Sequence, residues 1–288
     1  MPAEFFALAN AFLFALHNMF TKKGLRYSNP ATAVITSLFI NIIVLWGVSL
    51  LFIPLDSLHT PGVLLFVIVG LFQPGLTRLL TYKGIERLGV AITDPIRAST
   101  PLFSALFAIL LIGERMTLPI LVATLVIILG ITLLSQRDGA TKEVHLRYVL
   151  YPLLASLLGG FSQVLRKFGL GAVPHPFLAA AVTATSSLGV SLLTLWISER
   201  KKETLKLNRQ CLPHYLAAGI AVSLGMVAIY YALDRGKVTV VIPISSTGPL
   251  FALTLSAIFL RDVERVTLKI VLGAAMIIGG VLLITLWK

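Results

Sequence analysis

Long apolar runs alternate with short polar connections along the whole chain. A run of roughly 17–25 apolar residues can cross the hydrocarbon core of a bilayer as a helix. Ten such runs occur, at about residues 4–21, 31–53, 62–82, 91–112, 118–135, 147–166, 176–197, 213–233, 239–260 and 267–287. The pattern predicts an all-α integral membrane protein with ten transmembrane helices. No basic residues precede the first run, so we expect it to remain in the mature protein rather than act as a signal peptide.

Two of these runs are interrupted by the same proline-containing pattern. The fourth run contains DPIRASTP at residues 94–101, and the ninth contains IPISSTGP at residues 242–249. Proline has no N–H, so Pro101 leaves the carbonyl of Arg97, and Pro249 that of Ser245, without its helical partner. At membrane depth such groups are tolerated only where protein or a water-filled cavity meets them. We therefore expect both helices to be broken beside a cavity.

Other short patterns also recur, which indicates an internal duplication. Glu-Arg-x-Thr precedes the fifth run at residues 114–117 and the tenth at residues 264–267, and the polar loop 135–143 lies between the halves. We predict repeats over residues 1–138 and 145–288. Each repeat crosses the membrane five times, so the second enters from the opposite side, and the two should form inverted repeats with the substrate site between them near the midplane.

Composition supports a membrane protein and argues against several other classes. The chain is 57% hydrophobic and 12% charged, with a mean hydropathy of +0.93, far more apolar than a soluble average. The single cysteine, Cys211, excludes an internal disulfide and argues against a cysteine metal cluster. The net charge of +12 comes mainly from short loops between the runs, where Lys and Arg set orientation, so nucleic-acid binding is not expected.

Known catalytic motifs are missing from the sequence. It contains no His-Glu-x-x-His helix, no Gly-x-Ser-x-Gly elbow and no Walker loop, which argues against an intramembrane enzyme and against direct ATP drive. A repeated filter-like loop, as expected of a channel, is also missing. We predict that the protein is not an enzyme, with no catalytic residue, no metal site and no cofactor.

The repeats and their motifs resemble the drug/metabolite transporter superfamily in its ten-span form, which is built from two EamA-type domains. The resemblance rests on the five-span repeats, the polar proline-containing fourth span of each, and Gly113-Glu114 before a Thr-led fifth span. The second repeat departs from it, with Arg-Asp-Val-Glu at residues 261–264. Members are similar in carrying small polar metabolites such as amino acids, nucleosides or phosphorylated sugars.

The resemblance implies a secondary active transporter with alternating access, multi-pass in the cell (inner or plasma) membrane. Its partners would be a small-molecule substrate and the lipid bilayer, with a proton as a candidate coupling ion, and the assembly would be a monomer or homodimer. An exchanger of organic anions or phosphate esters stays open as an alternative, favoured by Arg78, Arg97 and Lys22 on candidate cavity faces.

Asp94 and Arg97 are the most conspicuous candidates for substrate binding. They are three residues apart and share a helical face if the helix survives Pro95. Insertion scales give a free-energy cost of roughly 2.5–3.5 kcal/mol for each such charge at a helix centre, so a pair of charges here needs a structural or functional explanation. One interpretation is a structural ion pair. In the other, Arg97 receives a carboxylate or phosphate bidentately, while Asp94 orients it or acts as the coupling site.

The remaining candidates are polar residues at matching depths in the two halves. Each has a second interpretation: Arg78 can snorkel to the interface, Tyr82 and Tyr230 can be interfacial anchors, and His17 can be an interhelical donor rather than a proton relay. The serines and threonines of the two octets can bond the freed carbonyls or the substrate. The predicted substrate-binding set is Asn18, His17, Arg78, Tyr82, Asp94, Arg97, Thr100, Gln163, Tyr230, Ser245 and Ser246.

Two further expectations concern the ends of the spans. Glu114 and Glu264 precede apolar runs and are interpreted as helix N-terminal caps outside the site. Most of the 24 Lys and Arg residues fall in loops after odd-numbered spans. The positive-inside rule therefore predicts external termini and a cytoplasmic 199–209 loop, whereas the family resemblance implies internal termini.

Overall fold

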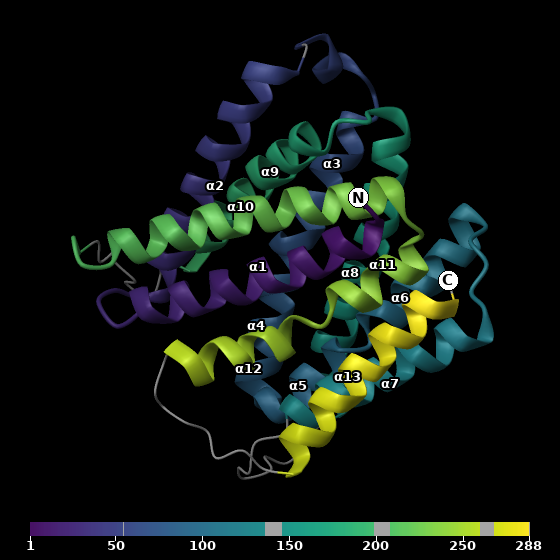
Figure 1. Ribbon diagram of the computed structural model, residues 1–288. Helices are drawn as coiled ribbons and strands as arrows, with labels where there is room; N and C mark the ends of the chain where they lie inside the picture. Colours follow the sequence, from purple (N-terminus) through teal and green to yellow (C-terminus); the bar gives the residue numbers. More distant parts are fainter. Residues whose placement is uncertain (54, 136–145, 199–207, 260–267, 288) are drawn as a thin grey trace.

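The computed structural model describes residues 1–53, 55–135, 146–198, 208–259 and 268–287, and these are almost entirely helical (Figure 1). The expected residues Glu264 and most of the 135–143 and 199–209 loops lie outside this part. The first half contains α1 (Ala3–Gly24), α2 (Pro30–Phe52), η1 (Leu55–His59), α3 (Val63–Gly70), η2 (Leu71–Leu76), α4 (Thr77–Leu88), α5 (Val90–Arg97), α6 (Thr100–Phe107), η3 (Ala108–Ile112) and α7 (Leu118–Ser135). The second half contains α8 (Leu146–Ala172), α9 (Pro176–Ser198), α10 (Leu212–Arg235), α11 (Val238–Ser245), α12 (Gly248–Phe259) and α13 (Leu268–Trp287).

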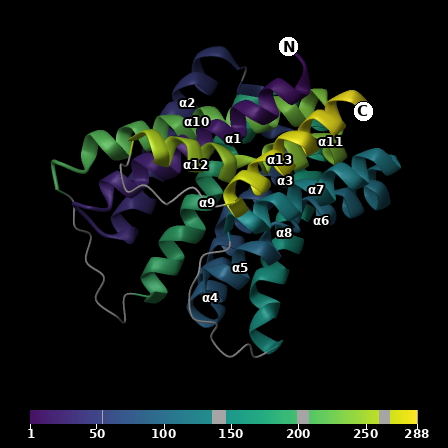
Figure 2. The ribbon, with the colours of Figure 1, turned by 60° about the horizontal axis from the view of Figure 1, so that its bottom comes forward.

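These helices confirm the predicted all-α membrane fold. Within the described ranges, nine helical stretches are long and apolar enough to span a bilayer, and Leu118–Leu134 is a shorter apolar helix between them. The third crossing runs on to Leu88 and the sixth to Ala172, both beyond the predicted ends. Both chain termini lie near the same end of the molecule in Figures 1 and 2, as an even number of crossings requires.

Packing between the halves follows a two-fold pattern. Helix α1 packs along α10, and in the same way α8 packs along α3 and α4. Helix α1 also contacts α12, and in the same way α8 contacts α6. The second helices of the two repeats, α2 and α9, pack on each other, and so do the last helices, α7 and α13. Exchanging the halves thus reproduces these contacts. This is the arrangement expected of two five-helix repeats that run in opposite directions.

Helices α7 and α13 form a close pair at the side of the bundle (Figure 1). A Cβ atom added to Gly130 would lie 2.7 Å from the carbonyl oxygen of Gly273, and one added to Gly280 would lie 2.9 Å from that of Ala123. Only glycine permits backbones to approach this closely, which is how small residues build membrane helix pairs. Gly279 has nothing within 4 Å and does not take part in this pair.

The third, fourth and ninth crossings are broken. Gln73 has φ −133° and ψ 118° within the third crossing, the extended conformation that a following proline imposes on its predecessor. In the fourth, α5 ends at Arg97 and α6 begins at Thr100; in the ninth, α11 ends at Ser245 and α12 begins at Gly248. The two octets are therefore broken at equivalent positions, as their prolines predict.

Candidate functional site

A cavity of about 540 Å³ lies between the two halves, where the broken helices meet α1, α2, α8 and α10. Its wall is mixed, with charged, amide and hydroxyl side chains interrupted by apolar ones. The described residues that line it are Asn10, Phe14, His17, Asn18, Ser37, Leu38, Asn41, Gln73, Pro74, Arg78, Asp94, Arg97, Ala98, Thr100, Ile131, Gln163, Arg166, Val222, Met226, Ile229, Ile242, Ser245, Ser246, Gly248 and Pro249.

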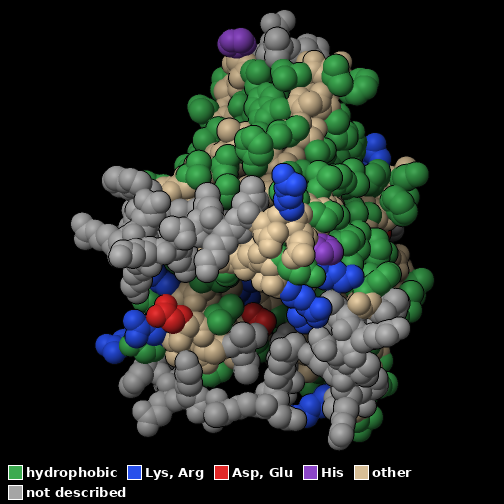
Figure 3. Space-filling model, turned by 90° about the vertical axis from the view of Figure 1, so that its left-hand side faces the viewer, with side chains coloured by type: hydrophobic (Ala, Val, Ile, Leu, Met, Phe, Trp, Pro, Cys, Tyr) green, Lys and Arg blue, Asp and Glu red, His purple; other side chains and the backbone are tan. Residues whose placement is uncertain are grey.

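The two ends of this cavity differ in exposure. We call the end with the α1–α2 and α4–α5 turns the basic end, because its described, exposed cations include Lys22, Arg26, Lys83 and Arg87. The opposite end, with both chain termini, is the terminal end. Figure 3 shows the basic end, where Lys and Arg side chains, with Asp and Glu side chains among them, lie around a hollow in the surface. Asn18 is exposed on this side, so the cavity opens toward the basic end.

The break between α5 and α6 is stabilised by hydroxyl groups. Thr100 Oγ1 donates to the carbonyl oxygen of Arg97 at 2.7 Å, which satisfies the group that Pro101 leaves without a helical donor. One residue earlier, Ser99 Oγ donates to the carbonyl of Ile96 at 2.6 Å, and Ser156 Oγ of α8 donates to the same carbonyl at 3.0 Å. The backbone that carries Arg97 is therefore fixed both locally and by α8.

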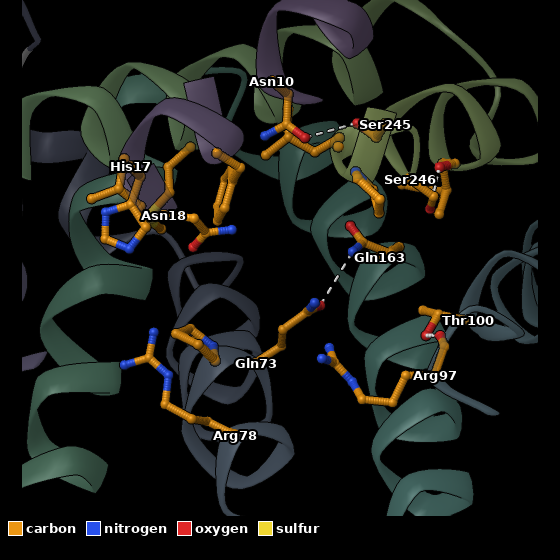
Figure 4. Close-up of a pocket in the computed structure, with 18 of the residues that line it drawn as sticks. Asn10, His17, Asn18, Gln73, Arg78, Arg97, Thr100, Gln163, Ser245 and Ser246 are labelled. Carbon is orange, nitrogen blue, oxygen red and sulfur yellow. Dashed lines mark hydrogen bonds between the residues drawn. The ribbon is translucent and has the colours of Figure 1, made fainter. Parts of the chain in front are cut away.

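Helix α1 forms one wall and is tied to the second half by polar side chains. His17 Nδ1 hydrogen-bonds with the carbonyl of Ala218 at 3.0 Å. Asn10 Nδ2 donates to the carbonyl of Gly225 at 2.8 Å, while its Oδ1 accepts from Ser245 Oγ at 2.9 Å. The Asn10–Ser245 bond links α1 to the broken ninth crossing at the cavity surface (Figure 4).

A chain of amides crosses the middle of the site. Gln163 Nε2 donates to Gln73 Oε1 at 3.2 Å, joining α8 to the broken third crossing (Figure 4). Gln163 Oε1 accepts from Arg166 at 3.0 Å, and the Arg166 guanidinium lies 5.4 Å from the centre of the Tyr230 ring. Both Gln163 and Arg166 are buried, so this chain leads from the cavity to its closed side.

The terminal end is closed by packing and by charged groups. Tyr230 is fully buried, its ring meets Phe66 edge-on at 5.7 Å, and its hydroxyl hydrogen-bonds with Thr183. Glu114 Oε1 accepts from the N–H of Val238 at 2.8 Å, and its Oε2 accepts from the N–H and hydroxyl of Thr239 at 3.0 and 2.9 Å. A carboxylate at a helix N-terminus is stabilising.

Glu114 is thus a cap, but not of the helix that follows it in the chain. It caps α11 of the other half. Lys167 acts on the neighbouring helix end, because its Nζ donates to the carbonyls of Leu233 and Gly236 at the C-terminus of α10. Together these two side chains fix the α10–α11 turn at the terminal end.

Nine of the eleven predicted site residues line the cavity. Tyr82 and Tyr230 do not: Tyr82 lies one turn beyond Arg78 toward the basic end and is 55% exposed, whereas Tyr230 is buried behind Arg166. The nine are His17, Asn18, Arg78, Asp94, Arg97, Thr100, Gln163, Ser245 and Ser246.

Several cavity residues were not in the predicted set, namely Asn10, Ser37, Asn41, Gln73 and Arg166. For some of them, the helical spacing from another polar residue could have indicated a place on the cavity wall. Asn10 lies two turns before His17, and Ser37 lies one turn before Asn41, so each pair shares a face. Asn41 Oδ1 accepts from Ser223 Oγ at 2.9 Å, which identifies it as part of the wall between α2 and α10.

Comparison with known proteins identifies relatives along the whole chain. The model of a family described as the EamA-like transporter family matches residues 1–136 and 146–286. An uncharacterized transporter of Archaeoglobus fulgidus is 26% identical over 244 residues, which cover 82% of this chain and 83% of that protein. An uncharacterized protein of Methanocaldococcus jannaschii is 33% identical over 95 residues, covering 33% of this chain and 68% of that protein.

A solved structure supports the fold independently. A crystal structure of a protein superimposes with a TM-score of 0.83 at 16% sequence identity, covering 99% of this chain and 96% of that one. At this identity the likeness concerns the fold alone. The arrangement of ten crossings is therefore one that a crystal structure also contains.

Proposed function

Because the chain belongs to the EamA-like transporter family, and with it to the drug/metabolite transporter superfamily, we propose that it is a secondary active transporter. It moves a small polar metabolite, such as an amino acid or a related compound, through the cavity between its inverted repeats by alternating access. The observation that carries this proposal is the polar cavity itself, which lies between the halves, opens toward the basic end and is closed at the terminal end.

The volume and wall of the cavity suit a metabolite-sized solute. A volume of about 540 Å³ falls within the range of ordinary small-molecule sites. The broken helices supply polar groups at the depth where discontinuous helices of carriers bind their substrates. Closure at one end only is what distinguishes a carrier in one of its two states from an open pore.

Counterflow in proteoliposomes tests the proposal. Vesicles containing the purified protein and loaded with excess unlabelled metabolite should transiently accumulate the labelled form, and initial rates should saturate. Flux that rises linearly without counterflow would indicate a channel and contradict the proposal. Across a metabolite panel, a compound that is a substrate should also raise the apparent Tm of the purified protein, because it binds the folded state.

Water access to the broken helices gives a second test. Cysteines placed at Thr100 and Ser246, in a chain whose buried Cys211 is replaced by serine, should react with water-soluble thiol reagents, because both positions line the cavity. Substrate should protect them. Inertness of both positions from both sides of the membrane would contradict a central aqueous site.

We further propose a plasma-membrane location with the basic end facing the cytoplasm, since the excess of loop Lys and Arg is retained there. The open end of the cavity would then face the cytoplasm. A membrane-impermeant maleimide applied to intact cells should miss a cysteine at Arg26 and label one at Arg115, on the terminal side. The reverse labelling would overturn this orientation and agree with internal termini.

A further inference from the structure

We propose that the transported solute carries an oxyanion, a carboxylate or a phosphate, and that Arg97 binds this group in the cavity, where Arg78 adds a second positive charge. This inference rests on the proposed function and names the chemical class of its substrate. Three properties of the site support it: the balance of charge on the wall, the position of Arg97, and the donor group at the end of the amide chain.

The charge balance is positive. Among the described lining residues, Arg78, Arg97 and Arg166 are cations, and Asp94 is the single carboxylate. Three positive side chains against one negative leave an excess of two charges in a cavity at membrane depth. Charges in such a place are costly unless they are paired. An anionic solute supplies the missing countercharge, whereas a neutral or cationic solute does not.

Arg97 is placed to receive that solute. It is the last residue of α5, and its carbonyl is held by Thr100 Oγ1 at 2.7 Å, so the backbone below the side chain is fixed. Its buried Nε has no hydrogen-bond partner among the described residues. A guanidinium with a donor to spare binds carboxylate or phosphate through paired hydrogen bonds. The side chain extends into the cavity beside Gln73 (Figure 4).

Arg78 adds a second positive charge to the same cavity wall. It follows the break at Pro74 by one helical turn, and in Figure 4 it lies on the other side of Gln73 from Arg97. Cations that line a low-dielectric cleft raise the local concentration of anions. The exposed cations of the basic end extend this positive field outward.

The amide chain that crosses the site ends in a hydrogen-bond donor. Gln163 Oε1 accepts from Arg166, and Gln73 Oε1 accepts from Gln163, so the Nε2 group of Gln73 is the end of the chain that still has donors. A solute rich in acceptor oxygens complements this donor, and oxyanions have the most acceptor sites for their size.

Ligand-induced stabilisation of the purified full chain tests the charge class directly. The probes are succinate against succinamide, and glucose 6-phosphate and inorganic phosphate against glucose, with putrescine as a cation, all at fixed ionic strength. At least one acidic probe should raise the apparent Tm, and its neutral analogue should not. Succinate as the active probe would identify a carboxylate solute, and either phosphate compound a phosphate solute. No shift with any acidic probe, or an equal shift with glucose, succinamide or putrescine, overturns the inference.

Variants locate the binding group. Arg97→Gln should weaken binding of the active probe at least about tenfold, because a charge-assisted pair is lost. Arg97→Lys should recover only part of the affinity, since lysine keeps the charge but not the bidentate geometry. Arg87→Gln is the matched control, because Arg87 is exposed outside the cavity, over the Tyr148 ring. Unchanged binding in Arg97→Gln overturns the role given to this residue.

Binding and flux separate this inference from the proposed function. Saturable counterflow of a neutral or cationic solute would overturn the oxyanion class and leave the carrier intact. Binding of an acidic probe that depends on Arg97, without counterflow of that probe, would support the oxyanion site and count against the carrier.

Discussion

The terminal end and the basic end of the cavity are built from equivalent parts of the two repeats, yet one is closed and the other open. Lys167 and Lys22 occupy matching positions before Gly-Leu in α8 and at the end of α1. At the terminal end Lys167 binds the last carbonyls of α10, while at the basic end Lys22 is exposed. The tyrosines of the third crossing of each repeat differ in the same way, because Tyr230 is buried and Tyr82 is 55% exposed.

Matching residues of the two repeats thus differ in their contacts, so residue type alone does not decide which end is closed. Among the described residues, the matching lysines and tyrosines are present at both ends, but they make closing contacts at the terminal end only. In a carrier built from inverted repeats, the two states exchange the roles of the repeats around a fixed central site. Under the proposed alternating access, the contacts at the terminal end are a model for those that the basic end would form on closing, and the predictions below test which of them matter.

Among these variants, loss of the Glu114 carboxylate should lower the stability of the protein the most. Glu114→Gln removes the charge that accepts three hydrogen bonds from Val238 and Thr239. Hydrogen bonds to charged groups are worth about 1.5–3 kcal/mol, so we expect a loss of stability of about 3 kcal/mol, seen as a lower apparent Tm in detergent and a lower yield of folded protein. Arg115→Gln, at the exposed neighbouring residue, is the control. Equal stability of the two variants would show that the cap does not hold the closed end.

The two matching lysines give a direct comparison of the ends. Lys167→Gln should cost about 1.5 kcal/mol, because the ammonium loses charge-assisted bonds to two helix-terminal carbonyls. Lys22→Gln should stay within about 0.5 kcal/mol, as is usual for an exposed side chain. Thermal unfolding of both variants in the same detergent measures the difference. Similar losses would mean that the ends are equivalent in solution.

Most of the fold could be predicted from the sequence because bilayer thickness and proline chemistry are strong local constraints. The apolar runs marked the crossings, and Pro101 and Pro249 marked the breaks at Arg97 and Ser245. Polar side chains within the apolar runs must contact protein or water rather than lipid. His17 and Asn18 in the first run and Gln163 in the sixth could therefore be assigned to a shared cavity from the sequence, and all three line it.

The unpredicted features depend on contacts between the halves. The position of Glu114 before a span indicates a cap, but only packing shows that the capped helix is α11. Tyr82 and Tyr230 look alike in the sequence, and their different exposure follows from which end is closed. The burial of Arg166 could not be predicted either, because a cation at the end of an apolar run is usually an interfacial residue. Only the structure shows that Arg166 contacts Gln163 and the Tyr230 ring.

Removal of the tyrosine hydroxyls should have the smallest effect on stability and gives the most direct test of how the two ends differ. Tyr230→Phe keeps the ring that Phe66 and Arg166 contact and removes only the hydrogen bond with Thr183. We expect a loss of about 1 kcal/mol, the usual net value for a buried hydrogen bond, because the Thr183 hydroxyl still donates to the carbonyl of Phe66 at 3.3 Å. Tyr82→Phe should have almost no effect on thermal unfolding while the basic end is open, since its side chain is largely exposed. If a ligand closes the basic end, the Tyr82→Phe variant should gain less stability from that ligand than the unsubstituted protein does, because Tyr82 then becomes a buried residue as Tyr230 is now. An identical gain in both proteins would contradict the exchange of roles between the repeats.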